Sequence, residues 1–271
     1  MPLHIANLGS SFSAGPSIPP VANKAAGRSG ANFACLASQR VGARLTDLSV
    51  SGSTLLNLLS EPQSAGGETF APQIDDLPAD ADVVLVLSGG NDIGYIGGMF
   101  ADTLNSWVYG LGSALVWLYD FTGNANWCLD LDTEGLAARY GEALDAIHAK
   151  APGARVVVVE YFTMLGRDTV PGRDVTFGAD RVEYHKGVAA RLLSATVKAV
   201  QQRAPWCVKV DLAAASEAHA IGSVEPWVSS FTWDLYREGG AYHPNAAGMK
   251  AASELVYQKL VELGIVEGGK S

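Results

Sequence analysis

Short runs of apolar residues recur along the chain, each bounded by polar residues or glycine. Val83–Leu87 and Val156–Val159 are the clearest, because every side chain in them is apolar. Runs of this length without polar alternation are typical of strands that are buried on both faces of a parallel sheet. The pattern therefore predicts strands at Leu3–Leu8, Arg44–Val50, Asp82–Ser88, Arg155–Tyr161 and Val208–Leu212.

The segments between these strands have apolar residues at the three-to-four spacing of amphipathic helices. They are Asn32–Val41, Ser53–Leu59, Thr133–Lys150, Ala179–Arg203 and Ala246–Leu263. Alternation of strand and helix favours a parallel sheet with helices on both faces. We expect a single α/β domain over residues 1–271, since no linker or internal repeat divides the chain.

Two longer segments interrupt this alternation. Glu61–Asp80 is rich in Pro, Gly and Ala and is expected to be a surface excursion. An insertion at about residues 93–127 is rich in aromatic side chains instead. One interpretation is a helical hairpin that packs on the main core; the other is an apolar wall or lid beside a binding site. The aromatic residues concerned are Tyr95, Phe100, Trp107, Tyr109, Trp117, Tyr119, Phe121 and Trp127.

Composition excludes several classes of partner. The formal net charge is −9 and there is no run of basic residues, so nucleic acid and anionic membranes are not expected partners. No apolar stretch approaches the ~20 residues of a transmembrane helix. The first strand begins almost at the N-terminus, which leaves no room for a signal peptide. We therefore expect a cytoplasmic protein, or a secreted one if the sequence is a mature form with an added Met.

The cysteines give little guidance about the compartment. Cys35, Cys128 and Cys207 are odd in number and have no metal-ligand spacing, so no metal site is expected. Cys35 fits an apolar helical pattern and is interpreted as a core residue. Cys128 and Cys207 each follow a tryptophan; a disulfide between them is conceivable, but two free thiols are favoured.

Residues with catalytic potential follow the predicted strands. Ser11 lies in the small-residue turn after the first strand, Gly52 follows the second, and Asn91 follows the third in Gly89-Gly90-Asn91-Asp92. His243 precedes the last helix in His243-Pro244-Asn245. Each motif is weak alone, but the carboxyl ends of parallel strands meet at one edge of the sheet. A hydroxyl, oxyanion donors and an imidazole together are typical of acyl transfer.

In this order, the four blocks resemble the SGNH (GDSL-type) hydrolase superfamily. Ser11 matches the nucleophile block, Gly52 the glycine block, Asn91 the GxND block and His243 the histidine block. The segment 219–227 also resembles the actinobacterial lipase and phospholipase branch. The resemblance implies a three-layer, flavodoxin-like fold with a five-stranded parallel sheet, and ester hydrolysis without a metal or organic cofactor.

The resemblance also implies a role for each block. Ser11 would form an acyl intermediate, with His243 as its general base. The backbone N–H groups of Ser11 and Gly52 and the Asn91 side chain would form the oxyanion hole. A small-molecule or lipid ester is the expected substrate, and the oligomeric state stays open. The candidate substrate-binding residues are Tyr95, Phe100, Trp107 and Trp227.

The chain departs from the family pattern at two positions. Ser10 stands where most relatives have an aspartate next to the nucleophile. Gly240 stands three residues before His243, where the family usually has its acidic triad member. We predict that the backbone carbonyl of Gly240 orients His243, with Glu238 and then Asp234 as alternatives.

Three functions therefore remain open. The leading hypothesis is a carboxylic ester hydrolase of the esterase or lipase type. A carbohydrate O-acetyl esterase is an alternative within hydrolysis. The missing aspartate also leaves open a catalytically impaired relative that binds a ligand in the same cleft.

Overall fold

The predicted strands form one five-stranded sheet in the computed structural model, which describes residues 2–114 and 131–268. The sheet has the order β4-β1-β7-β8-β9, and all of its neighbouring strands are parallel. In chain order this is the 2-1-3-4-5 arrangement of flavodoxin-like folds. The strands are β1 (His4–Gly9), β4 (Arg44–Asp47), β7 (Val83–Leu87), β8 (Arg155–Val159) and β9 (Cys207–Val210).

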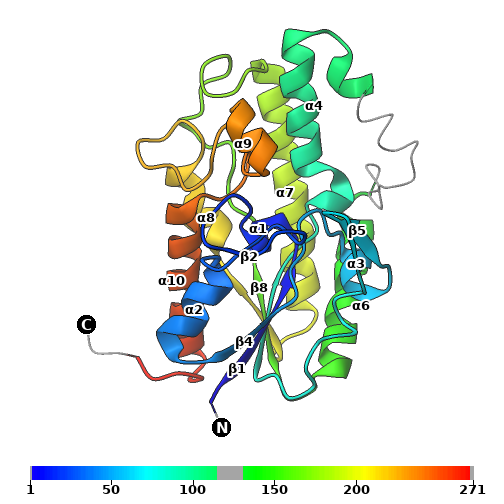
Figure 1. Cartoon of the computed structure of the whole chain (residues 1–271), viewed down its shortest axis with the longest axis vertical. Helices are drawn as coiled ribbons and strands as arrows, with labels where there is room; N and C mark the ends of the chain where they lie inside the picture. The colour runs from blue at the N-terminus through cyan, green and yellow to red at the C-terminus, as the bar shows by residue number, and fades with distance from the viewer. Residues whose placement is uncertain (1, 115–130, 269–271) are drawn as a thin grey trace.

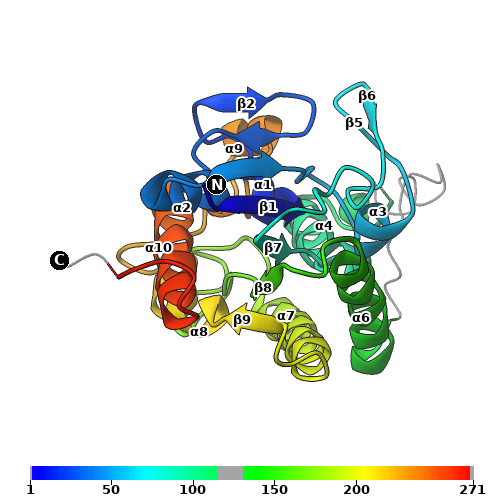
Figure 2. The same ribbon diagram turned by 90° about the horizontal axis from the view of Figure 1, so that it is seen from below.

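Helices cover both faces of this sheet. One face carries α2 (Phe33–Val41) and α10 (Ala246–Glu262), which pack against each other (Figure 2). The other face carries α3 (Leu55–Leu59), α6 (Thr133–Lys150) and α7 (Ala179–Gln201). The expected three-layer α/β/α fold is therefore confirmed. No helix within the described residues has the length and apolarity needed to cross a membrane.

Burial explains the apolar runs. Every residue of β7 is fully buried, and β8 is buried except at its first residue, Arg155. Both strands lie inside the sheet and are covered by helices on both sides, so neither face tolerates a polar side chain. The predicted strand Arg44–Val50 ends earlier, at Asp47, whose carboxylate accepts hydrogen bonds from Asn7 and Asn32.

Shorter elements decorate the sheet without belonging to it. The hairpin of β5 (Gln63–Ala65) and β6 (Glu68–Phe70) lies in the predicted surface excursion, but Gln73 in the same segment is buried. The others are α1 (Ser11–Ala14), β2 (Val21–Asn23), β3 (Arg28–Ser29), η1 (Asn91–Ile93), α4 (Tyr95–Trp107), α8 (Leu212–Ser216), η2 (Glu217–His219) and α9 (Trp233–Glu238).

The aromatic insertion begins as a helix. Helix α4 rises beyond the carboxyl ends of the strands, beside α9 and above α1 (Figure 1). Trp117, Tyr119, Phe121, Trp127 and Cys128 lie outside the described residues. The state of Cys128 is therefore not addressed, while Cys35 and Cys207 are free thiols, as favoured for Cys207.

The strand-to-turn junction at Gly9 sits against β7. A Cβ at this position would lie 2.3 Å from the carbonyl oxygen of Leu87 and 2.7 Å from Cβ of Ser13. Both distances are below van der Waals contact, so any larger side chain must displace the backbone of β1 or β7. The close approach aligns the turn that carries Ser11 with the end of β7.

We therefore expect Gly9→Ala to lower the free energy of unfolding by about 1–3 kcal/mol, the usual cost of overpacking. Gly153→Ala is the matched control, because a Cβ there meets no atom within 4 Å. Urea unfolding followed by circular dichroism measures both. Equal midpoints for the two variants would contradict the close approach at Gly9.

Candidate active site

The position of Ser11 follows from the abrupt end of β1. Ser11 is the first residue of α1, a single helical turn. It directly follows Ser10, whose backbone N–H donates to Leu87 O at the end of β7. The turn is closed by Gly15, whose φ of 74° is the left-handed conformation that glycine favours, and whose N–H donates to Ser11 O at 2.9 Å. Strand and helix together hold the Ser11 hydroxyl at the carboxyl edge of the sheet, with 7% of the residue exposed.

His243 lies in the loop between α9 and α10, and the loop is fixed on both sides. The backbone of Ser229 pairs with Tyr242 and His243 through hydrogen bonds of 3.1 and 2.9 Å. Asn245 accepts from Gly248 N as the N-cap of α10, and its side-chain N–H donates to the carbonyl of Pro226 at 2.7 Å. Because these contacts hold the backbone, the imidazole needs little reorganisation to reach the nucleophile turn.

The two side chains meet although 232 residues separate them. His243 Nε2 lies 2.8 Å from Ser11 Oγ. The other ring nitrogen, Nδ1, lies 2.7 Å from the backbone carbonyl oxygen of Ala241. A carbonyl can only accept, so Nδ1 carries the proton and Nε2 is left to accept from the serine hydroxyl. This is the tautomer that a general base for Ser11 requires.

The group that orients the ring differs from the expectation. Gly240 was predicted to accept from the imidazole, but its carbonyl accepts the backbone N–H of His243 at 3.2 Å, and the ring bonds to Ala241 instead. Glu238 and Asp234 do not bond to the ring, because both ring nitrogens are already engaged; Asp234 pairs with Arg237 at the surface.

The usual acidic residue would also fit poorly at position 240. A Cβ on Gly240 would lie 2.0 Å from Ser17 Oγ and 2.9 Å from Ser17 Cβ. A carboxylate at this position would first have to displace Ser17. Local packing therefore disfavours an aspartate at position 240, and the carbonyl of Ala241 bonds to the His243 ring instead.

Burial sets the charge of His243. The imidazole is 8% exposed, and removal from water lowers its pKa from 6.5 to about 4, although the hydrogen bond to Ala241 opposes this shift. The ring is therefore neutral near pH 7 and free to accept a proton.

Three donors are candidates for holding an oxyanion. Ser11 N is one of the first N–H groups of a helix, which have no intrahelical acceptor, and Gly52 N–H donates to no acceptor in the described part of the chain. Gly52 has a φ of 86°, a conformation that favours glycine. Asn91 donates one side-chain N–H to the carbonyl of Ser53 at 2.9 Å, which fixes the amide and leaves its second N–H available.

Tyr161 joins two of these blocks. Its hydroxyl oxygen lies 3.0 Å from Ser10 Oγ and accepts the N–H of Gly90 at 3.1 Å. Burial raises the pKa of Tyr161 to about 12, so the phenol keeps its proton. The position where relatives have an aspartate is thus occupied by Ser10, and a tyrosine from the end of β8 connects it to the loop that carries Asn91.

Gln73 connects the nucleophile turn to the glycine block. Its side-chain carbonyl accepts from Gly9 N at 2.8 Å, while its side-chain N–H donates to Gly9 O and to Ser53 Oγ, both at 3.0 Å. Gln73 is 4% exposed, so these bonds are shielded from water. The segment predicted to be a surface excursion therefore contributes a buried support of the site.

Asp92 supports the Asn91 loop. The carboxylate is fully buried, accepts from Leu55 N at 2.9 Å and pairs with Arg139 at 3.1 Å. Burial raises its pKa to about 6, while both partners oppose the shift. The pair joins η1, α3 and α6 behind the candidate oxyanion donors.

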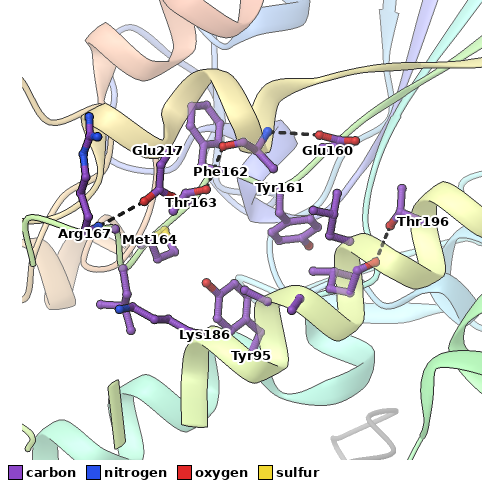
Figure 3. A pocket seen from close by; sticks show the side chains of 17 residues that line it. Tyr95, Glu160, Tyr161, Phe162, Thr163, Met164, Arg167, Lys186, Thr196 and Glu217 are labelled. Atoms are coloured by element: carbon purple, nitrogen blue, oxygen red, sulfur yellow. Dashed lines mark hydrogen bonds between the residues drawn. The ribbon is translucent and has the colours of Figure 1, made fainter. Parts of the chain in front are cut away.

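The candidate substrate-binding residues are dispersed. Tyr95 lines a cavity of about 340 Å³ together with Tyr161, Met164 and Lys186 (Figure 3), but neither Ser11 nor His243 lines it. Trp227 stacks on His219 at 4.0 Å between ring centroids, which gives His219 a supporting role in its loop.

Phe100 and Trp107 belong to a different group of rings. Phe100 packs on Tyr242, the residue before His243, at 5.3 Å between centroids, and Trp107 packs on Phe231 and Trp233. The buried-core interpretation does not hold for Trp107, which is 47% exposed, and Phe100 is half-buried. The wall-or-lid interpretation stays a prediction.

Sequence reasoning missed Tyr161, Gln73 and the Ala241 carbonyl. A signal existed for Tyr161, since it is the last residue of a predicted strand and so had to lie at the carboxyl edge. Gln73 gives no comparable signal, because its partners are fixed only by tertiary packing. Within residues 2–114 and 131–268, no three His, Cys, Asp or Glu side chains are grouped so as to hold a metal ion.

Sequence comparison finds relatives over most of the chain. A family model described as GDSL-like Lipase/Acylhydrolase matches residues 8–251. "Lipase 2" of Streptomyces coelicolor is 30% identical over 265 residues, which span 91% of this chain and 82% of that protein.

Solved structures share the fold at lower identity. Phospholipase A1 from Streptomyces albidoflavus has a TM-score of 0.71 at 21% identity, with 96% of this chain and 99% of that chain covered. An extracellular lipase from Streptomyces rimosus has a TM-score of 0.68 at 22% identity, with coverages of 95% and 98%. A family 2 carbohydrate esterase from Corynascus thermopiles has a TM-score of 0.56 at 19% identity, with coverages of 97% and 67%.

The buried, neutral state of His243 can be measured directly by NMR of the ¹⁵N-labelled imidazole. We expect the Nδ1–H tautomer at pH 6 and protonation with a midpoint near pH 4, because desolvation outweighs the bond to Ala241. The half-buried His219 provides a second imidazole signal for comparison. A midpoint at or above 6.5 for His243, or the Nε2–H tautomer, would contradict the geometry.

Proposed function

The chain belongs to the GDSL-like lipase/acylhydrolase family and is an ester hydrolase, and we propose that it cleaves carboxylic esters through an acyl intermediate on Ser11. The observation that carries this proposal is the 2.8 Å contact between Ser11 Oγ and His243 Nε2, with the opposite ring nitrogen held by Ala241. A nucleophile, a base in the required tautomer and a group that orients the base are the parts of a serine hydrolase site.

The reaction begins when Ser11 Oγ attacks the ester carbonyl and its proton passes to His243 Nε2. Negative charge develops on the former carbonyl oxygen, where Ser11 N–H, Gly52 N–H and the free N–H of Asn91 donate to it. Each such donor typically contributes about 10²–10³ in kcat. Collapse of this intermediate breaks the bond to the alcohol, which leaves with the proton from His243.

The second half of the reaction reverses the roles. His243, neutral again, takes a proton from water, and the hydroxide attacks the acyl-Ser11 carbonyl. The acid leaves and Ser11 regains its proton. In both halves the imidazolium is stabilised by the Ala241 carbonyl dipole rather than by a full carboxylate charge.

Esters with an apolar acyl chain are the proposed substrate class, rather than acetylated carbohydrates. Phe100 of α4 and Phe231, which precedes α9, pack on Tyr242 next to His243, and apolar side chains beside the site favour apolar groups over sugars. The names of the Streptomyces lipase and phospholipase point the same way. A catalytically impaired relative is disfavoured, since the carbonyl of Ala241 orients the His243 ring in place of the usual acid.

Kinetics on p-nitrophenyl esters of rising chain length tests the proposal. We expect turnover of butyrate and longer esters, and losses in kcat on the order of 10⁴–10⁶ for Ser11→Ala and for His243→Ala. The double variant should be no slower than either single one, because the two groups act as one unit.

Ser88→Ala is the control for Ser11→Ala. Ser88 is fully buried just after β7 and its hydroxyl has no hydrogen-bond partner among the described residues, so its loss should leave kcat unchanged. Full activity of Ser11→Ala, or turnover restricted to acetyl esters of carbohydrates, would contradict the proposal.

Tyr161→Phe tests whether the link between Ser10 and Gly90 matters for the reaction. Removing the hydroxyl leaves the N–H of Gly90, next to Asn91, without its acceptor. We expect kcat to fall about tenfold while KM changes little, because a tenfold loss corresponds to about 1.4 kcal/mol in the free energy of the transition state alone. Tyr140→Phe is the matched control, since it removes a buried hydroxyl that donates to Ser88 O at 3.2 Å. Both variants should lose similar stability, and equal kcat values would show that the link is structural only.

A further inference from the structure

Exposed aromatic side chains gather on one surface formed by the end of α4 and by α9. Trp107, Trp233 and Tyr236 are 47%, 48% and 45% exposed. We call these three residues the aromatic patch. Large apolar side chains that share a surface in this way usually mark a binding face.

The patch is built on a packed layer of rings. Trp107 and Trp233 lie 5.3 Å apart between ring centroids, and both pack edge-on against Phe231 beneath them. Tyr236 contacts Phe100 at 5.5 Å in a T-shaped arrangement. These contacts order most of the patch before any partner arrives, so little side-chain entropy remains to be lost on binding.

The same ring layer reaches the candidate active site. Phe100 and Phe231 both contact Tyr242, at 5.3 and 6.1 Å, and Tyr242 directly precedes His243. The Tyr242 hydroxyl also bonds to Thr103 of α4 at 2.6 Å. Figure 1 shows α9 beside α4, above the short helix α1 that carries Ser11. A surface that covers the patch therefore lies next to the catalytic residues.

The chemistry of the patch favours a neutral lipid surface. Tryptophan and tyrosine combine an apolar ring with a polar N–H or O–H, which suits the boundary between headgroups and acyl chains. The exposed charges on α9 are Asp234 and Arg237, which pair at 3.2 Å, and Glu238, so the helix has no excess of positive charge for anionic headgroups. The net charge of −9 opposes approach to an anionic membrane, whereas a zwitterionic surface exerts no such repulsion.

We propose that the aromatic patch docks the protein on the surface of zwitterionic phospholipid, so that ester substrate reaches Ser11 from that surface. The proposal rests on the proposed function for the fate of the ester, but the docking step itself needs no catalysis. Docking can therefore be measured in a protein that cannot turn over.

The binding experiment uses Ser11→Ala protein and sedimenting phosphatidylcholine vesicles. Adding Trp233→Ser or Tyr236→Ser should lower partitioning about tenfold each, since each removes a ring from the contact. Trp233→Phe retains a ring and should keep most of the binding. Tyr184→Ser is the matched control for Tyr236→Ser, because Tyr184 is 52% exposed on α7 and has no ring contact with the patch.

The activity experiment uses the same substitutions with Ser11 intact. Hydrolysis of vesicle-bound ester should fall with the loss of partitioning, while kcat/KM for dissolved p-nitrophenyl butyrate should stay unchanged. Absence of turnover on the dissolved ester would refute the proposed function, while the sedimentation of Ser11→Ala protein with vesicles would still test the docking proposal.

Three outcomes would overturn the docking proposal. They are no sedimentation with phosphatidylcholine vesicles, equal sedimentation of the serine variants and Tyr184→Ser, and binding that requires phosphatidylserine and disappears in salt. The first would indicate that the patch binds something other than a lipid surface.

Discussion

The hydrogen bond between Ser11 and His243 is the contact on which the site depends. It joins the first turn of the chain to the last loop before α10, and Ser11 Oγ has no other hydrogen-bond partner within residues 2–114 and 131–268. Burial keeps the ring neutral, and the Ala241 carbonyl selects the tautomer that leaves Nε2 open. In the proposed mechanism, this geometry, burial and tautomer allow an ordinary serine hydroxyl to give up its proton.

Much of the surrounding structure serves to keep this contact in register with the oxyanion donors. Tyr161 ties the turn before Ser11 to the loop of Asn91, and Gln73 ties the end of β1 to the turn after Gly52. Asp92 and Arg139 hold the Asn91 loop from behind. The Gln73 bonds are buried and the others are partly buried, where a hydrogen bond is stronger than in water and its loss more costly. The missing aspartate at position 10 is thus compensated by partners from elsewhere in the fold.

Sequence patterns predicted the sheet well because the strands are buried on both faces, which leaves uninterrupted apolar runs in β7 and β8. They also placed Ser11, Gly52, Asn91 and His243 at one edge, since that follows from the ends of parallel strands and from the family resemblance. The acceptor for His243 was wrong by one residue, because every residue has a carbonyl and only backbone geometry selects Ala241 over Gly240. Gln73 was beyond prediction, since its partners lie 64 and 20 residues away and are chosen by packing alone.

The central claim is that Ser11 is the nucleophile activated by His243. Its most direct measurement is reaction with an alkyl fluorophosphonate, followed by mass spectrometry of the digested protein. The account predicts one adduct, on Ser11, which forms much more slowly in His243→Ala and at full rate in Ser88→Ala. An adduct on another serine, or labelling of Ser11 at the same rate without His243, would contradict it.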